Sequence, residues 1–221
     1  MCFSAEADFA AAGVIGAVGA ATLLQARRPE ALPLAALPAL FALHQLTEGF
    51  VWLGMDGRLG AEATRRATFL FMLYAQAVLP AILAPAVALL EPDRARRLGM
   101  WALAAVGVGL GLWTAAGLIS APNTVAVEGR CLAFRNPATN HPWVAFTYAL
   151  PTCGAPLLSS HRVVRLFGAG ALLGFAVVLA VKAYALTSVW CLVVATLSVL
   201  LYAQFRAGRF APRPPAAVSP A

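Results

Sequence analysis

The stretch "PLAALPALFALHQLTEGFVWLG", residues 33–54, is an apolar run of the length that crosses a lipid bilayer, and it contains a histidine and a glutamate. A membrane-spanning helix needs about 20 mostly apolar residues. Comparable runs lie at about 9–25, 67–90, 99–119, 143–159, 165–184 and 187–205. The sequence therefore predicts an all-α, polytopic membrane bundle with seven transmembrane helices.

The composition supports this class. Of 221 residues, 61% are hydrophobic and only 11% are charged, with a mean hydropathy of +0.79, whereas an ordinary soluble domain has roughly 25% charged residues. Residues 1–206 are thus predicted to form one transmembrane domain. The outer loop at about 120–142 is long enough for a short hairpin or a cap, and the Pro-rich tail 207–221 is expected to be disordered.

The fifth run is the weakest of the seven. Its sequence "YALPTCGAPLL" contains Pro151 and Pro156, which are compatible with a broken or re-entrant helix, so six spans are the alternative. Part of it, "LPTCGAP" (150–156), resembles "LPAILAP" (79–85); this indicates either paired kinks or coincidence. Small residues such as Gly107 and Gly111 are expected to let helices approach closely.

Basic residues give the expected orientation, because cytoplasmic loops of membrane proteins are enriched in Lys and Arg. With the N-terminus outside, ten basic residues fall inside and six outside. The first run has no Lys or Arg before it, so it is interpreted as a helix rather than a signal peptide. We expect a multi-pass protein of the inner membrane, N-out and C-in.

The net charge of +7 is then explained by topology and by anionic lipid headgroups. A basic stripe interleaved with aromatic residues, which a nucleic-acid-binding protein would need, is absent from the sequence. The expected partners are the bilayer and a small ligand or ion, with no nucleic acid. The acidic residues Glu91 and Asp93, beside three arginines, are expected to be surface charges. The oligomeric state is not indicated.

His44 and Glu48 lie one helical turn apart and share a face of the second helix. At 1.5 Å per residue, His44 lies near the midplane and Glu48 about 6 Å nearer the outside. A charge at that depth costs about 2.5–3.5 kcal/mol on insertion scales unless it is paired, hydrated or protonated. The residues therefore indicate a functional polar site or, alternatively, a Glu48 that is protonated, or hydrogen-bonded to His44 or an indole, and that simply locks helices together.

Other polar and aromatic side chains are predicted at similar depths. Together they give a candidate polar intramembrane site in the outer half of the bundle: Glu48, His44, Gln76, Ser188, Trp190 and Trp52. The tryptophans have a second interpretation, because Trp52, Trp101, Trp143 and Trp190 also lie near helix ends. There they would form the aromatic belt of a membrane protein.

The four cysteines allow two interpretations besides inert buried thiols. Cys2, Cys131 and Cys191 fall on the predicted outer side, where an oxidising compartment permits a disulfide, and Cys153 falls within the membrane. Alternatively, a mixed thiolate, carboxylate and imidazole set would suit zinc or copper, formed by Cys2, Cys191, Glu48 and His141. No spaced ligand motif supports the metal site.

Three short motifs carry a family resemblance: "MCFSA" (1–5), "HQLTEGFVW" (44–52) and "SVWC" (188–191). Together they resemble an uncharacterised family of bacterial multi-pass membrane proteins. Its chains begin Met-Cys-Phe-Ser-Ala, carry Glu-Gly-x-x-Trp in the second helix and end with a Val-Trp-Cys helix. The resemblance implies no activity. It implies that Glu48 is the core of the site and His44 a variation, and it marks as family positions Cys2, Phe3, Ser4, Glu48, Trp52, Trp190 and Cys191.

Three functions fit the sequence. The first is ligand or ion binding coupled to transport or sensing, with Glu48 as a titrating carboxylate. The second is a membrane-embedded enzyme acting at the outer leaflet, with Glu48 as a general base or a metal ligand, and the third is a structural or accessory subunit. We expect the first, and the sequence names neither a substrate nor a reaction.

Overall fold

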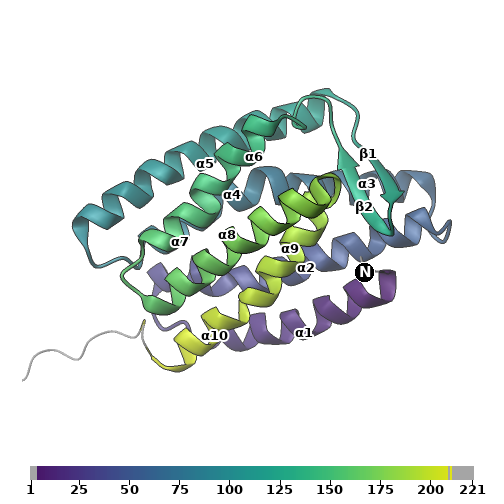
Figure 1. Ribbon diagram of the computed structural model, residues 1–221. Coiled ribbons are helices and arrows are strands. Elements are labelled where there is room, and N and C mark those ends of the chain that lie inside the picture. Colours follow the sequence, from purple (N-terminus) through teal and green to yellow (C-terminus); the bar gives the residue numbers. More distant parts are fainter. Residues whose placement is uncertain (1–3, 209, 211–221) are drawn as a thin grey trace, which may run out of the picture.

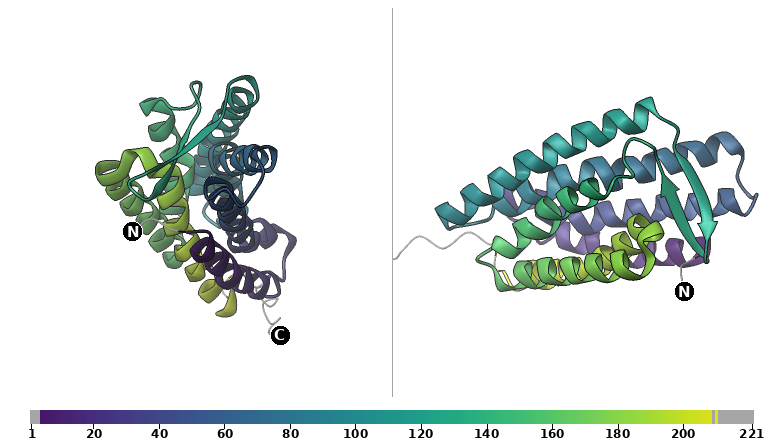
Figure 2. Two further views of the ribbon diagram at one scale, coloured as in Figure 1. Left: turned by 90° about the vertical axis from the view of Figure 1, so that its right-hand side faces the viewer. Right: turned by 45° about the horizontal axis from the view of Figure 1, so that its top comes forward.

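The computed structural model describes residues 4–208 and residue 210, and most of them are helical (Figure 1). Long helices lie along one direction, and a two-stranded hairpin crosses one end of the bundle (Figures 1 and 2). The longer elements are α1 (Ala5–Leu23), α2 (Leu32–Met55), α3 (Ala61–Leu73), α4 (Leu79–Ala88), α5 (Arg94–Ser120), β1 (Thr124–Glu128), β2 (Cys131–Arg135), α6 (Pro142–Ala149), α7 (Ala155–Leu158), α8 (Arg162–Lys182), α9 (Leu186–Leu197) and α10 (Val199–Arg206). Two short 3₁₀ segments are η1 (Pro29–Ala31) and η4 (Ala183–Ala185). The predicted tail, 207–221, falls largely outside the described residues.

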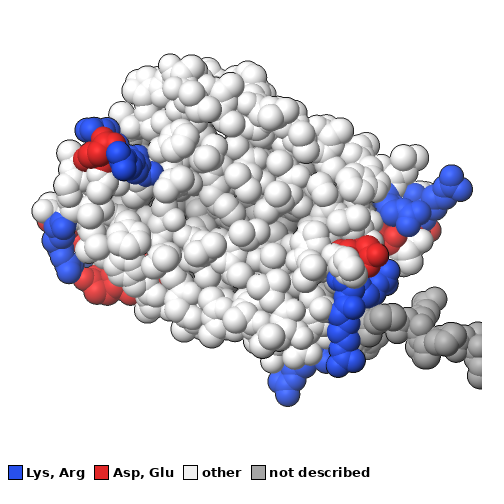
Figure 3. Space-filling view, turned by 180° about the vertical axis from the view of Figure 1, so that it is seen from behind, with Lys and Arg blue, Asp and Glu red and all other residues white. Residues whose placement is uncertain are grey.

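Within the part of the chain that the structure describes, five helical segments are long and apolar enough to cross a membrane: Ala5–Leu23, Pro29–Met55, Ala61–Ala88, Arg94–Ser120 and Arg162–Arg206. Figure 3 shows the charged side chains of one face gathered at the two ends, with a broad uncharged band between them. The predicted helical bundle with several potential membrane spans is thus confirmed in this coarser form. Of the seven predicted runs, the last two fall together in the segment Arg162–Arg206, which contains α8 and α9 on either side of η4, and Pro142–Leu158 is shorter than the other segments.

Two π-helical segments, η2 (Tyr74–Val78) and η3 (Leu150–Gly154), occur at the two similar proline-containing sequences. In the first, Pro80 has no N–H, so the carbonyl of Gln76 loses the donor that a regular helix would supply. The hydroxyl of Thr114 on α5 lies 2.8 Å from that carbonyl oxygen and 2.9 Å from the carbonyl oxygen of Leu110 in its own helix, and its proton is shared between them. A bond between helices thus compensates for the proline.

Both π-helical segments pack against α5, where glycine permits the contact. A Cβ atom at Gly107 would lie 2.0 Å from the carbonyl oxygen of Pro80 and 3.0 Å from Cβ of Pro151, and one at Gly111 would lie 2.5 Å from the carbonyl oxygen of Ala77. The similar sequences therefore form two kinks that flank one helix, and the expected close approach at Gly107 and Gly111 is confirmed.

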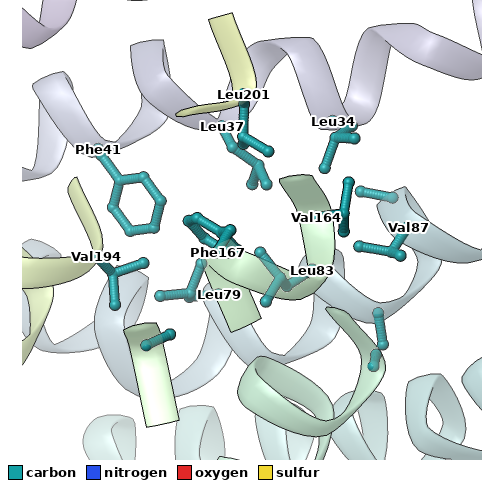
Figure 4. Packing of buried hydrophobic residues seen from close by; sticks show 14 of the residues in the cluster. Leu34, Leu37, Phe41, Leu79, Leu83, Val87, Val164, Phe167, Val194 and Leu201 are labelled. Carbon is teal, nitrogen blue, oxygen red and sulfur yellow. The ribbon is translucent and has the colours of Figure 1, made fainter. Parts of the chain in front are cut away.

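The main hydrophobic core lies between α2, α4, α8, α9 and α10, as Figure 4 shows for Phe41, Leu79, Phe167 and Leu201 among others. A second cluster lies nearer the hairpin and is built from α1, α2, α3, α5 and β2. Its buried members are Ala5, Val51, Trp52, Ala67, Phe71, Met72, Leu118, Leu132 and Phe134. The bundle is therefore packed along its length, and its second core reaches up to the strands.

The hairpin pairs β1 and β2 antiparallel, with Thr124 opposite Arg135. Strand β2 is almost wholly buried, and its Phe134 ring stacks on Phe71 of α3 with 4.2 Å between ring centroids. Cys131, at the start of β2, is disulfide-bonded. The hairpin and the start of α1 lie at the same end of the bundle (Figure 1), which we call the hairpin end.

Glu91, at the opposite end, is a correction to the expected surface charge, since only 2% of it is exposed. Its carboxylate accepts bonds from the backbone and hydroxyl of Ser160, from the hydroxyl of Ser159 at 3.2 Å and from the backbone N–H of Asp93 at 3.2 Å. Burial raises the pKa of Glu91, but the bonds from Ser160 and Asp93 outweigh it and hold the pKa below its ordinary value. Glu91 thus connects the turn before α5 to the turn before α8.

We expect Gly107→Ala to destabilise the protein by about 1–3 kcal/mol, the usual cost of overpacking, because the added methyl group would overlap the carbonyl of Pro80. Thermal unfolding of the detergent-solubilised protein measures this. Gly109→Ala is the matched control on the same helix, because nothing lies within 4 Å of its Cβ position. Equal melting temperatures for the two variants would contradict the packing described here.

Glu91→Gln should lower the stability at pH 7 by about 1.5–3 kcal/mol, the range for hydrogen bonds to charged groups. Because the folded-state pKa of Glu91 is lowered, its contribution is present above the ordinary value of 4.5 and is lost as the pH falls through the lowered value. The difference between wild type and variant should therefore shrink below pH 4.5. Glu30→Gln, at the same end, removes only an exposed pair with Arg28 and should have almost no effect.

Candidate functional site

One face of α2 is polar in its half nearer the hairpin end. His44, Gln45, Glu48 and Trp52 are all buried there, with Glu48 completely so. Residues four apart lie above one another on a helix, so His44, Glu48 and Trp52 follow one stripe. Glu48 lies about 10 Å along the helix axis from the end of α2 at Met55, at 1.5 Å per residue.

Asp8 of α1 joins this face, and sequence reasoning missed it. Its side chain is 1% exposed, and its Oδ1 accepts a hydrogen bond from Nε2 of Gln45 at 3.1 Å. The signal was the spacing of the buried residues of α1, which alternates between three and four along Ala5, Asp8, Ala12, Ile15, Gly19 and Thr22. That spacing is typical of a helix packed along one seam.

The α1–α2 contact that buries Asp8 is close. A Cβ at Gly19 would lie 2.5 Å from the backbone nitrogen of Ala39, so these helices approach with little side-chain volume between them. Gly49 of α2 likewise faces the ring of Phe9, which would be 2.6 Å from a Cβ there. Asp8 lies in this seam between the two helices and is buried there.

Ser188 of α9 contacts Glu48, which belongs to the polar face of α2. Its hydroxyl donates a hydrogen bond to Oε1 of Glu48. The second oxygen of each carboxylate, Oδ2 of Asp8 and Oε2 of Glu48, is buried with no hydrogen-bond partner. Within residues 4–208 and 210, no Lys, Arg or His side chain forms an ion pair with either carboxylate. We call Asp8, Gln45, Glu48 and Ser188 the carboxylate cluster.

His44 is buried beside this cluster but does not bond to it. Its ring stacks on Phe71, with 4.1 Å between centroids, and lies 4.7 Å from the ring of Tyr74. Both ring nitrogens lack a partner, as does the indole nitrogen of Trp52. The expected bond from Glu48 to His44 or to an indole is therefore wrong, and Ser188 takes its place.

A cavity of about 340 Å³ lies next to the carboxylate cluster, bounded by η2, α6, α8, α9 and the segment after β2. Four predicted site residues line it: Gln76, Trp190, His141 and Cys191. Cys191 is also within electrostatic reach of Glu48. The predicted site residues thus fall into two neighbouring groups, the carboxylate cluster and the cavity wall, and α9 contributes residues to both.

The four tryptophans that could form an aromatic belt differ in how exposed they are. Trp101 and Trp143 are 43% and 49% exposed, which fits an aromatic belt, whereas Trp52 and Trp190 are buried. The indole N–H of Trp190 donates to the carbonyl of Ala171 on α8 at 2.9 Å. The belt interpretation is therefore wrong for Trp52 and Trp190, because their helix faces turn them into the bundle.

The predicted metal ligands are only partly brought together. Cys191 and His141 both line the cavity, and Glu48 lies nearby, but no group of three or more His, Cys, Asp or Glu side chains among the described residues could hold a metal ion. Cys2 lies outside the described residues, so the zinc or copper site stays a prediction. Cys153 and Cys191 are free thiols.

The chain belongs to the family of unknown function DUF6629, whose model matches residues 1–216. This agrees with the resemblance to an uncharacterised family, while the family motifs and a bacterial origin stay predictions. No curated protein and no solved structure matches the chain significantly.

We expect Ser188→Ala to lower stability by about 1–3 kcal/mol, because it leaves Oε1 of buried Glu48 without its donor. Thr196→Ala is the control on α9, since Thr196 is exposed and bonds only to the carbonyl of Leu192 in its own helix. A double-mutant cycle with Glu48→Gln should give a coupling of about 0.5–3 kcal/mol. A coupling of zero would contradict a direct bond.

Proposed function

We propose that this protein is an integral membrane protein that binds a proton or a small cation at Asp8 and Glu48. Occupation of this site is coupled to binding of a small ligand in the neighbouring cavity, and the coupling serves transport or sensing. The observation that carries the proposal is the pair of buried carboxylates, Asp8 bonded to Gln45 and Glu48 bonded to Ser188, with no ion pair to a cationic side chain of the described residues.

The physical reason is electrostatic. Two ionised carboxylates in apolar surroundings would each cost several kcal/mol and would repel one another. A proton shared within the cluster, or a bound cation, removes most of that cost. The unpaired oxygens of Asp8 and Glu48 provide the positions where either could bind.

Coupling to the cavity is supported by α9. Ser188 contacts Glu48, while Trp190 and Cys191, two and three residues further along, line the cavity. A ligand that shifts α9 would change the bond to Glu48, and a change in the charge of Glu48 would act on the cavity wall. Binding at two such sites is reciprocal by linkage.

The proposal includes a topology of seven spans. The contacts between α8 and α9, and the reversal at η4 visible in Figure 2, support two crossings within Arg162–Arg206, and Pro142–Leu158 would supply one more. The disulfide-bonded Cys131 supports an oxidising compartment at the hairpin end. Among the described residues, eight basic side chains lie toward the other end, Arg27, Arg28, Arg94, Arg96, Arg97, Arg162, Arg165 and Arg206, as expected for N-out and C-in in a bacterial inner membrane.

Carbodiimide labelling tests the proposed site. A hydrophobic carbodiimide reacts with a protonated carboxyl group inside a membrane, so peptide mass spectrometry should find Glu48 or Asp8 modified. The modification should decrease as the pH rises. Protection by Na⁺ or K⁺ would identify a cation as the occupant, and no protection would identify a proton.

Glu91 is the internal control for this labelling, because it is equally buried but fully hydrogen-bonded as an anion, and it should stay unmodified at neutral pH. Glu48→Gln and Asp8→Asn assign the modified residue. Absence of label from both residues at every pH in the folded protein would contradict the proposal.

A further inference from the structure

The cavity beside the carboxylate cluster has a wall of aromatic rings set at right angles. Trp190 lies at its centre, with the ring of Tyr148 at 5.3 Å and 75° and the ring of Phe175 at 5.9 Å and 90°. All three residues line the cavity, and they come from α6, α8 and α9. Rings that meet at right angles present both faces and edges to one small volume.

Two polar groups in the same cavity lack partners. The side-chain oxygen of Gln76 and the hydroxyl oxygen of Thr139 are buried with no hydrogen bond, although both residues line the cavity. Thr139 is only 5% exposed. An amide oxygen can only accept, so an occupant that carries positive charge or donates a hydrogen bond would suit these groups.

The charges around the cavity favour a cation. Glu48 lies close behind Cys191, and the positive side chain on the cavity wall, Arg135, is paired with Glu128 at 2.6 Å. His141 belongs to an exposed part of the rim. An aromatic wall beside a carboxylate is the arrangement that binds quaternary ammonium groups, because the faces of aromatic rings attract positive charge.

We propose that the cavity binds a small organic ammonium ion of the trimethylammonium type, held by the rings of Trp190, Tyr148 and Phe175. The inference rests on the proposed function, in which the carboxylate cluster supplies the negative charge near the ligand. The same chemical group occurs in free solutes such as choline and in the headgroup of phosphatidylcholine.

Calorimetric titration of the purified protein in phosphatidylglycerol nanodiscs tests the proposal. Choline should bind more tightly than its neutral carbon analogue, in which carbon replaces the nitrogen. Phe175→Leu, which removes a ring and keeps an apolar side chain, should weaken choline binding about threefold to thirtyfold, the range expected for a cation–π contact. Tyr148→Phe keeps the ring and should change the affinity little.

Comparing the two lipids shows whether the trimethylammonium group comes from a free solute or from a lipid headgroup. If choline binds equally in phosphatidylglycerol and phosphatidylcholine nanodiscs, the ligand is a free solute; if phosphatidylcholine alone abolishes choline binding, the headgroup occupies the cavity. Equal binding of choline and its carbon analogue, or no binding of choline in phosphatidylglycerol, would overturn the inference. Carbodiimide labelling of Glu48 in the same sample reports separately on the carboxylate cluster.

Discussion

A backbone carbonyl inside a bilayer has no water to bond to, so the protein must supply every donor. Pro80 removes one such donor, and the Thr114 hydroxyl replaces it by bonding to the carbonyl of Gln76. That bond requires α5 to lie directly on η2, which the missing side chain of Gly111 permits at the carbonyl of Ala77. The same local widening of the helix sets the register of Tyr74 and Gln76, and Gln76 thereby reaches the cavity.

The buried carboxylates also depend on a few specific contacts between helices. α1 packs on α2 beside Asp8, where Gly49 faces the ring of Phe9, and Asp8 is buried there within reach of Gln45. Helix α9 contacts Glu48 through the hydroxyl of Ser188. Each carboxylate is half satisfied, so its charge state depends on what else occupies the cluster. A site of this kind can respond to a proton, a cation or a ligand with a small movement of one helix.

The sequence predicted the helices because apolar runs of about 20 residues identify them without reference to their neighbours. Glu48 was found because a carboxylate in such a run is costly. Asp8 was missed because the acidic residues near the N-terminus were considered only as charges, although the spacing of Asp8, Ala12 and Ile15 marks a packed seam. Same-face reasoning from Glu48 would also have buried Trp52, one turn further along α2.

Other contacts were beyond prediction from one sequence. Glu91 and Ser160 are 69 positions apart, and Glu48 and Ser188 are 140 apart; depth in the membrane suggested only that the second pair could meet. The division of the predicted site into a cluster and a cavity depends on the order of helices around the bundle. Hydrophobic periodicity does not specify that order.

The charge state of the two carboxylates is the central claim, and infrared spectroscopy measures it directly. In a buffer without small cations at neutral pH, wild-type protein in nanodiscs should show a carboxylic-acid carbonyl band that resists exchange with solvent. That band should disappear in Glu48→Gln or in Asp8→Asn and persist in Glu30→Gln. A wild-type spectrum with ionised carboxylates only, unchanged by either of the first two substitutions, would contradict the account.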